Sequence, residues 1–512
     1  MNPAELNIFS SRLDAICDEM GLVLRNAAFS PNIRDRLDFS CAIFDANGSL
    51  CAQAAHIPVH LGSMAFAMRD IVEGMDWQPG DQVVFNDPYL GGTHLPDVTL
   101  VAPVFVSGER VGFVVNRAHH ADIGAERPGS MPVSRSLEEE GQVIPPSMLV
   151  RGGGLDDAML QALTGATRNP LESRGDYAAQ LAANRSGLRA LERLVTHYGL
   201  EAFRDGLADL NDYAERLAMH ALGQIPDGSY RYTDYLDDDG QGHSDIRIQV
   251  CVYVRQDGVS VDFDGTDPQV PGNVNCPLAV AAAAVWYVFR CLMPPQTPAC
   301  AGAFRPIRLS APEGCLLNAR RPAAVAAGNV ETSTRVVDAL LGALAQALPS
   351  RVPAASQGTM NNLAMGGEGV VGWSYYETIA GGMGAHAQGE GMDAVQSHMT
   401  NTLNTPIEIL ESQYPLRVSR YAIRDRSGGE GLHRGGNGLI REFEFLGNTH
   451  FTLLTDRRRH APWGNSGGSD GAPGLNRLNG EPVPGKFESY VQAGDRLSIE
   501  TPGGGGWGAA KD

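Results

Sequence analysis

One stretch decides how the fold and the candidate site are interpreted: NDPYLGGTHLPDVTLVAPVFVSGERVGFVVNRAHHADIG, from Asn86 to Gly124. Two runs rich in Val and Phe flank a short polar turn, and this pattern predicts an antiparallel β-hairpin. A two-residue loop at Gly108-Glu109 pairs Asp97 with His120 across the base of the hairpin. A three-residue loop centred on Gly108 pairs Asp97 with His119 instead, and the pattern leaves both registers open.

The same stretch brings potential metal ligands together. His94 and Asp97 lie in a turn formed by Gly91, Gly92 and Pro96. Either hairpin register places a carboxylate and an imidazole about 5 Å apart. Two imidazoles and one carboxylate with open positions suit a divalent Mn, Fe or Zn ion, which polarises a carbonyl or acidifies a bound water. The alternative is that these histidines only satisfy backbone groups of the loops.

Two further acidic positions lie near this pattern in the sequence. Asp38 directly precedes a predicted strand and follows Arg34, Asp35 and Arg36. It is either a further carboxylate of the same centre or a strand-entry residue paired with a neighbouring arginine. The acidic run Leu137–Gly141 is expected to form a solvated turn, with the alternative that one of its carboxylates lies near the metal.

The remaining pattern predicts an α+β fold, a large, mixed and intertwined body. Helical spacing runs over Pro3–Phe29, Asp176–Leu222 and Thr332–Leu348, while a hairpin over Phe39–Gln53 and a strand region over Ile246–Phe263 are β-like. The expected regions are a β-hairpin-rich one carrying the site (1–175), a helical one (176–230), a mixed one (231–350) and a glycine- and asparagine-rich one (351–512). The last ends in TPGGGGWG, which we expect to be a loop or tail.

Composition excludes several classes of function. The 512 residues carry 40 Lys+Arg against 59 Asp+Glu, a formal charge of −19, which argues against nucleic-acid and membrane partners. The eight cysteines form no C-x-x-C pair, so free thiols in a reducing compartment are expected. The amino-terminal stretch has no apolar signal region, and the longest apolar run, Leu278–Phe289, is shorter than the roughly 20 residues that span a bilayer. We therefore expect a cytoplasmic protein.

Three polar stretches downstream are candidates for substrate binding: GNVETSTR (328–335), SQGTMNN (356–362) and SHMTNTLNTPIE (397–408). Their side chains can hydrogen-bond a polar substrate or cap turns. Arg335, Asn361 and His398 are the substrate-binding candidates among them. The chain has no G-x-x-x-x-G-K-[ST] motif, so no Walker-type ATP site is predicted.

Several motifs together resemble the hydantoinase B/oxoprolinase family over nearly the whole chain: FNDPYLGGTHLPDVTLVAPVF, NRAHHADIGAERPGSMP, GNVNCP, GNVETSTRVVDALL and HMTNTLNTPIEILE. The family includes B subunits of N-methylhydantoinases, the C-terminal half of 5-oxoprolinase, and subunits of acetone- and acetophenone-type carboxylases. The resemblance implies a separate A-type subunit that binds ATP and phosphorylates a carbonyl oxygen.

The resemblance also implies the ligands of one divalent metal ion, Mn, Zn or Fe. The family pattern falls on His94, Asp97 and His119, and so favours His119 over His120. Asp38 matches a carboxylate of the same centre, where it binds the metal or takes a proton from water. The implied function is the metal-dependent subunit of a hetero-oligomeric amidohydrolase that opens a cyclic amide or imide. A subunit of a ketone carboxylase and a non-catalytic scaffold for the A-type subunit are the alternatives.

Overall fold

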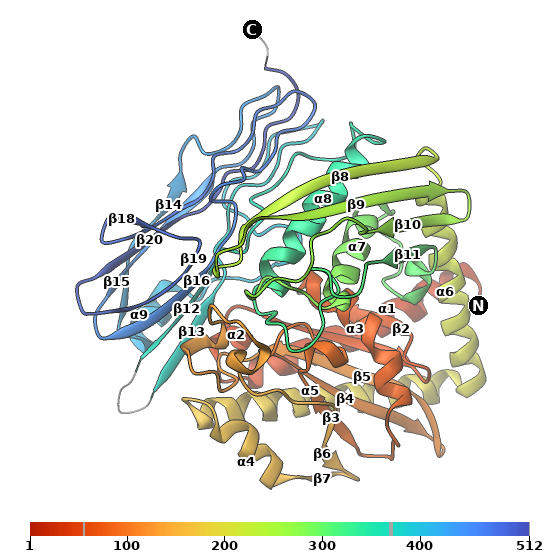
Figure 1. Ribbon diagram of the computed structural model, residues 1–512. Coiled ribbons are helices and arrows are strands. Elements are labelled where there is room, and N and C mark those ends of the chain that lie inside the picture. Colours follow the sequence, from red (N-terminus) through yellow and green to blue (C-terminus); the bar gives the residue numbers. More distant parts are fainter. Residues whose placement is uncertain (55–56, 368–371, 511–512) are drawn as a thin grey trace.

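The computed structural model describes residues 1–54, 57–367 and 372–510 (Figure 1). Its amino-terminal part is built on a seven-stranded antiparallel sheet with the order β2-β1-β5-β4-β3-β6-β7. These strands are β1 (Phe39–Asp45), β2 (Leu50–Ala54), β3 (Gln82–Phe85), β4 (Asp97–Val106), β5 (Glu109–His119), β6 (Ser147–Arg151) and β7 (Gly154–Leu155).

Helices cover both faces of this sheet. One face packs against α1 (Pro3–Ala27) and α5 (Pro170–Tyr198), and the other packs against α3 (Pro58–Glu73). Because successive side chains of a strand point to opposite faces, Ile43 contributes to the core beneath α1, whereas Phe44 contributes to the core beneath α3. The same alternation decides which side chains of β4 and β5 face α3.

The middle of the chain stacks further layers on α3. At Gly62, a Cβ atom would lie 2.4 Å from Cα of Ala283, so glycine permits the close approach of α3 and α7 (Leu278–Leu292). Helix α7 packs against α8 (Ser333–Ala345), which covers a four-stranded sheet of order β11-β10-β9-β8 (Figure 1). These strands are β8 (Gly228–Asp238), β9 (Ser244–Arg255), β10 (Gly258–Asp262) and β11 (Ile307–Ser310). The remaining α-helices of the amino-terminal and middle parts are α2 (Pro31–Arg34), α4 (Asp157–Gly165) and α6 (Leu200–Leu222).

Two antiparallel sheets form the carboxy-terminal part, drawn in teal and blue in Figure 1. Their orders are β13-β12-β16-β19 and β14-β15-β20-β17-β18, and they enclose an apolar core with α9 (Ile407–Gln413). The strands are β12 (Asn362–Gly367), β13 (Trp373–Glu377), β14 (Leu416–Arg424), β15 (Gly438–Phe445), β16 (Thr449–Leu454), β17 (Leu475–Leu478), β18 (Glu481–Val483), β19 (Lys486–Val491) and β20 (Arg496–Glu500).

The stretch TPGGGGWG was expected to be a loop or a tail; residues 501–506 have no regular secondary structure and form a loop, and the tail alternative is wrong. Residues 501–506 are buried, and the amide of Gly504 donates to the carbonyl of Gly436 (2.9 Å). A Cβ atom at Gly504 would lie 2.1 Å from the carbonyl oxygen of Met383, so only glycine fits between the neighbouring backbone segments. The glycine-rich segments therefore pack backbone against backbone and form part of the interior.

The predicted α+β class is confirmed. The three helical stretches correspond to α1, to α5 and α6 with a break at Gly199, and to α8, which a π-helical turn at Gly328–Thr332 precedes. The predicted hairpin over Phe39–Gln53 is β1 and β2. All eight cysteines are free thiols. Among the described residues, no helix has the length and apolar character needed to cross a membrane.

Candidate metal centre

The register of the β4–β5 hairpin pairs Asp97 with His119. The turn residues are Ser107 and Gly108 (φ 53° and 85°), not Gly108 and Glu109 as the two-residue loop assumed. A register shift close to the turn then moves the pairing by one residue, so the base of the hairpin has the pairing that the three-residue loop predicted. Asp97 and His119 therefore point to the same face of the sheet, toward α3.

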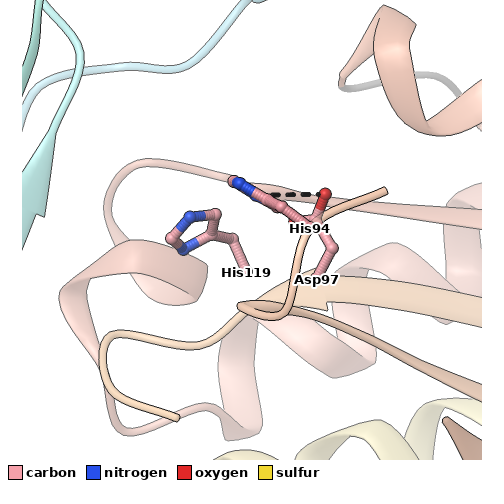
Figure 2. Close-up of side chains that lie close together, drawn as sticks. All are labelled: His94, Asp97 and His119. Atoms are coloured by element: carbon pink, nitrogen blue, oxygen red, sulfur yellow. Dashed lines mark ion pairs between the residues drawn. The ribbon is translucent and has the colours of Figure 1, made fainter. Parts of the chain in front are cut away.

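His94, Asp97 and His119 converge at this base (Figure 2). One ligand atom from each lies within 4.8 Å of the others, and all three residues are buried. Nε2 of His94 is 3.3 Å from Oδ2 of Asp97, and the two imidazole rings have centroids 5.1 Å apart. The structure thus brings together three of the predicted metal ligands.

The unused polar atoms of these residues fit a cation. Among the described residues, Nε2 of His119 is buried without a hydrogen-bond partner. Nε2 of His94 and Oδ1 of Asp97 are also buried without a hydrogen bond and have only ion-pair contacts of 3.3 Å, to Asp97 and His60 respectively. The other imidazole nitrogens are fixed, since Nδ1 of His94 lies 3.2 Å from the carbonyl oxygen of Ala326 and Nδ1 of His119 lies 3.2 Å from Nδ2 of Asn32. An unpartnered buried polar atom costs about 1–3 kcal/mol. Coordination of a divalent ion would satisfy all three atoms.

The charge states of Asp97 and His119 suit coordination as well. Burial would raise the pKa of Asp97, but the imidazoles of His60 and His94 lower it well below the usual range. Burial and the nearby His94 hold the pKa of His119 well below its usual range. An ionised carboxylate and a neutral imidazole are the forms that bind metals. Asp97 is thus ionised and His119 neutral near neutral pH. Burial opposes protonation of His94, but the carboxylate of Asp97 raises the pKa of this imidazole, so His94 would give up its proton when a metal binds.

Asp38 lies on the wall of the same small cavity, which has a volume of about 20 Å³. Such a volume holds about one water molecule or ion. The side chain of Asp38 is buried, and its Oδ2 is 3.8 Å from Nη1 of Arg36. Burial raises the pKa of Asp38, and Arg36 partly opposes this shift. The geometry thus allows both predicted roles, carboxylate of the centre and partner of an arginine.

His120 lies on the opposite face of the sheet. Its Nε2 is 2.9 Å from Oε1 of Gln180, and its ring packs against Tyr177; both neighbours belong to α5. Strand alternation explains this position, since His119 and His120 are consecutive. The structure therefore does not bring His120 to the cluster.

His60 is a further member of the centre that sequence reasoning missed. It lies on α3, with Nε2 3.3 Å from Oδ1 of Asp97 and Nδ1 3.3 Å from Oγ of Ser40. One turn later, Ser63 accepts a hydrogen bond from the buried Arg117 of β5 (2.7 Å). The sequence signal for His60 was its helical spacing from Ser63, which places both side chains on one face of α3.

The three candidates for substrate binding lie elsewhere, and none belongs to the described residues that line the cavity. Arg335 is buried against the carboxylates of Asp234 (3.5 Å) and Asp456 (2.8 Å). Nδ2 of Asn361 donates to the carbonyl of Ile379 (3.0 Å), and Nε2 of His398 is 3.8 Å from Oδ1 of Asp338. A role of Arg335, Asn361 and His398 in substrate binding stays a prediction.

Comparison with known proteins matches residues 2–510 to the sequence model of the family described as hydantoinase B/oxoprolinase. A 5-oxoprolinase of Dictyostelium discoideum is 38% identical over 99% of this chain, which spans 40% of that longer protein. The putative B subunit of a D-/L-hydantoinase from Pseudomonas sp. (strain NS671) is 34% identical, with 99% of this chain and 90% of that protein covered. The crystal structure of an ATP-dependent caprolactamase from Pseudomonas jessenii superimposes with a TM-score of 0.93 at 29% identity, covering 99% of this chain and 91% of that one. The chain belongs to the hydantoinase B/oxoprolinase family.

Proposed function

We propose that this chain is the metal-dependent B subunit of an ATP-dependent amidohydrolase that opens a cyclic amide or imide ring. The observation that carries the proposal is the convergence of His94, Asp97 and His119 at a buried centre with unpartnered ligand atoms. The names of the three relatives refer to 5-oxoproline, hydantoin and caprolactam, which are all cyclic amides. A shared ring-opening chemistry at this centre is the simplest account of both observations.

His94, Asp97 and His119 would hold one divalent ion, Mn, Zn or Fe. When bound, such an ion polarises a carbonyl oxygen and lowers the pKa of a coordinated water. Asp38, on the wall of the same cavity, either completes the ligand set or accepts the proton of the attacking water. Tyr376 stacks on His119 with ring centroids 4.6 Å apart and keeps this imidazole in place.

Hydroxyl groups offer hydrogen bonds to the substrate. Thr378, Thr400 and Thr402 line the cavity, and Oγ1 of Thr378 lies 2.6 Å from Oγ1 of Thr402. Ligand sites usually measure about 300–1,000 Å³, far more than the 20 Å³ here. A cyclic amide therefore needs more room beside this centre than the cavity of this structure offers.

ATP would act through a partner. No Walker-type motif occurs in the sequence, and this chain corresponds to 40% of the length of the 5-oxoprolinase. We therefore assign phosphorylation of the carbonyl oxygen to a separate A-type subunit in a hetero-oligomer. Free thiols fit a reducing compartment, so we place this complex in the cytoplasm.

The test is ring opening by the chain co-expressed with an A-type subunit. Hydantoin, 5-oxoproline and caprolactam would be supplied with ATP and Mn²⁺, and the ring-opened product would be measured by mass spectrometry. We expect turnover that requires ATP, metal and both subunits, and that Asp97→Ala abolishes. Full turnover by the Asp97→Ala complex would favour the scaffold role, whereas bicarbonate-dependent product from a ketone would favour the carboxylase.

A further inference from the structure

We propose that Glu140 is a positioning residue for the metal centre: it fixes the main chain at Val325 and Ala326, which in turn orients His94. This inference rests on the proposed function, because it concerns the same centre. Glu140 belongs to the acidic run that was expected to form a solvated turn. That expectation holds for the exposed Glu138 and Glu139 but is wrong for Glu140, which is fully buried.

One oxygen of Glu140 carries three hydrogen bonds. Glu140 ends the short 3-10 turn Leu137–Glu140, and its Oε1 accepts from Oγ of Ser134 (2.7 Å), from the amide of Val325 (2.8 Å) and from the amide of Ala326 (2.9 Å). Two consecutive amides aimed at one oxygen define the orientation of the peptide group between them. The position of the main chain at Val325 and Ala326 therefore depends on the length of the Glu140 side chain.

The same peptide segment contacts His94. The carbonyl oxygen of Ala326 lies 3.2 Å from Nδ1 of His94, and this contact directs Nε2 toward Asp97. A carbonyl that accepts from one imidazole nitrogen sets the tautomer in which the other nitrogen is free to bind a metal. Glu140 thus acts on the His94 ligand through one peptide group, without a direct contact of its own.

A second ligand depends on the same segment. Two residues after Ala327, whose amide donates to the carbonyl of Asn273 (3.0 Å), the π-helical turn Gly328–Thr332 presents Asn329. Nδ2 of Asn329 donates to Oδ2 of Asp97 (3.2 Å). A shift of the segment would therefore disturb both His94 and Asp97.

The geometry indicates that the length of the Glu140 side chain, not its charge, holds the segment in place. Oε2 of Glu140 has no hydrogen-bond partner in the described part of the chain. Burial raises the pKa of Glu140 to about 7, so a neutral side chain is tolerated here. A glutamine amide oxygen can accept the same three hydrogen bonds, whereas an aspartate keeps the carboxylate but is one methylene too short.

The experiment compares Glu140→Gln with Glu140→Asp in the full chain. Free Mn²⁺ would be measured by electron paramagnetic resonance during titration of metal-free protein, and urea unfolding of the metal-free proteins would report their folding. We expect Glu140→Asp to bind Mn²⁺ about 10- to 100-fold more weakly than wild type and Glu140→Gln to stay within about twofold. Glu138→Gln, an exposed neighbour, is the matched control and should bind as wild type does.

Other outcomes would overturn either the positioning role of Glu140 or the metal centre. Weak binding by Glu140→Gln with normal binding by Glu140→Asp would mean that the charge matters, and would overturn the positioning role. Equal Mn²⁺ affinity in all folded variants would also overturn it while leaving the proposed function intact. If Glu140→Asp does not fold, the glutamine variant alone decides, since weakened binding there overturns the inference. A wild-type chain that binds no Mn²⁺, Zn²⁺ or Fe²⁺ would overturn the metal centre itself.

Discussion

Two buried polar clusters of this molecule differ in how their charges are matched. The first, here the ion network, consists of Asp234, Asp338, Asp456, Arg335, Arg457 and Lys486. The charges of its three cations and three carboxylates sum to zero, and each charged group lies within 3.5 Å of one of opposite sign. The second is the metal centre of His94, Asp97 and His119. Its one carboxylate lies beside imidazoles and accepts from Thr93 and Asn329, and it forms no ion pair with an arginine or lysine among the described residues.

The ion network has the features of a structural cluster, whereas the metal centre has those of a ligand site. A matched network of ion pairs joins α8, β8 and the segments around β16 and β19, and it needs no ligand. In the metal centre, one ligand-type atom from each residue lies within 4.8 Å of the others, and each side chain has a buried polar atom that forms no hydrogen bond among the described residues. Buried groups of the second kind are tolerated where a bound ion satisfies them.

The largest expected effect is loss of the metal. Purified wild-type chain should contain about one equivalent of Mn, Fe or Zn, and a His94→Ala/Asp97→Ala double variant should contain almost none, because two of three ligands are gone. Elemental analysis of both proteins checks this. Metal in the double variant at the wild-type level would mean that His94, Asp97 and His119 are structural residues.

Breaking the ion network should cost stability instead. Asp456→Ala leaves Arg335 and Lys486 without their shared carboxylate in the interior, and removal of one partner of a buried pair costs about 3–5 kcal/mol. Urea unfolding should report this loss, while the metal content stays at the wild-type level. A variant that unfolds normally but loses metal would contradict the separation of the two clusters.

A smaller, pH-dependent effect on stability is expected at Glu331, a buried carboxyl group near Asp456. Its Oε1 accepts from Nδ2 of Asn362 (2.7 Å), and burial together with the charge of Asp456 raises its pKa to about 7. The unfolded chain loses this proton near pH 4.5. Between these values the folded state holds more protons, so stability falls as the pH rises from about 4.5 to about 7.

Glu331→Gln removes this dependence because glutamine resembles the neutral acid. Relative to the variant, wild type should lose about 3 kcal/mol of unfolding free energy over that window, because the pKa of Glu331 is about 7 in the folded state and 4.5 in the unfolded chain. Unfolding curves of both proteins at pH 4.5, 6 and 8 measure the difference. Parallel pH profiles would show that Glu331 is ionised in the folded state.

The sequence predicted those parts of the fold and site that depend on local pattern. Helical spacing gave α1, and strand alternation ensured that only one of His119 and His120 faces Asp97. The choice between them depended on a register shift near the turn, which the strand pattern alone does not specify. Family resemblance, not spacing, favoured His119.

Contacts between distant segments could not be predicted in this way. The carboxylate partners of Arg335 are Asp234 and Asp456, which lie 101 and 121 residues away in the sequence, so the local pattern around Arg335 did not predict these ion pairs. The interior position of the glycine-rich segments follows from close backbone approach, which composition does not report. His60 reaches Asp97 only because α3 packs on the face of the sheet to which β4 directs this carboxylate.

His60 gives the last and smallest prediction. Its Nε2 lies 3.3 Å from Oδ1 of Asp97, and residues that orient a ligand from outside typically change metal affinity by about 10- to 100-fold. We expect His60→Ala to bind Mn²⁺ about tenfold more weakly. This is the lower end of that range, because Thr93 and Asn329 still donate to the other oxygen of Asp97. His120→Gln is the matched control, an equally buried histidine on the opposite face, and should leave Mn²⁺ affinity within about twofold. If both variants weaken binding equally, the effect is one of general packing, and the distinction between the two faces of the sheet fails.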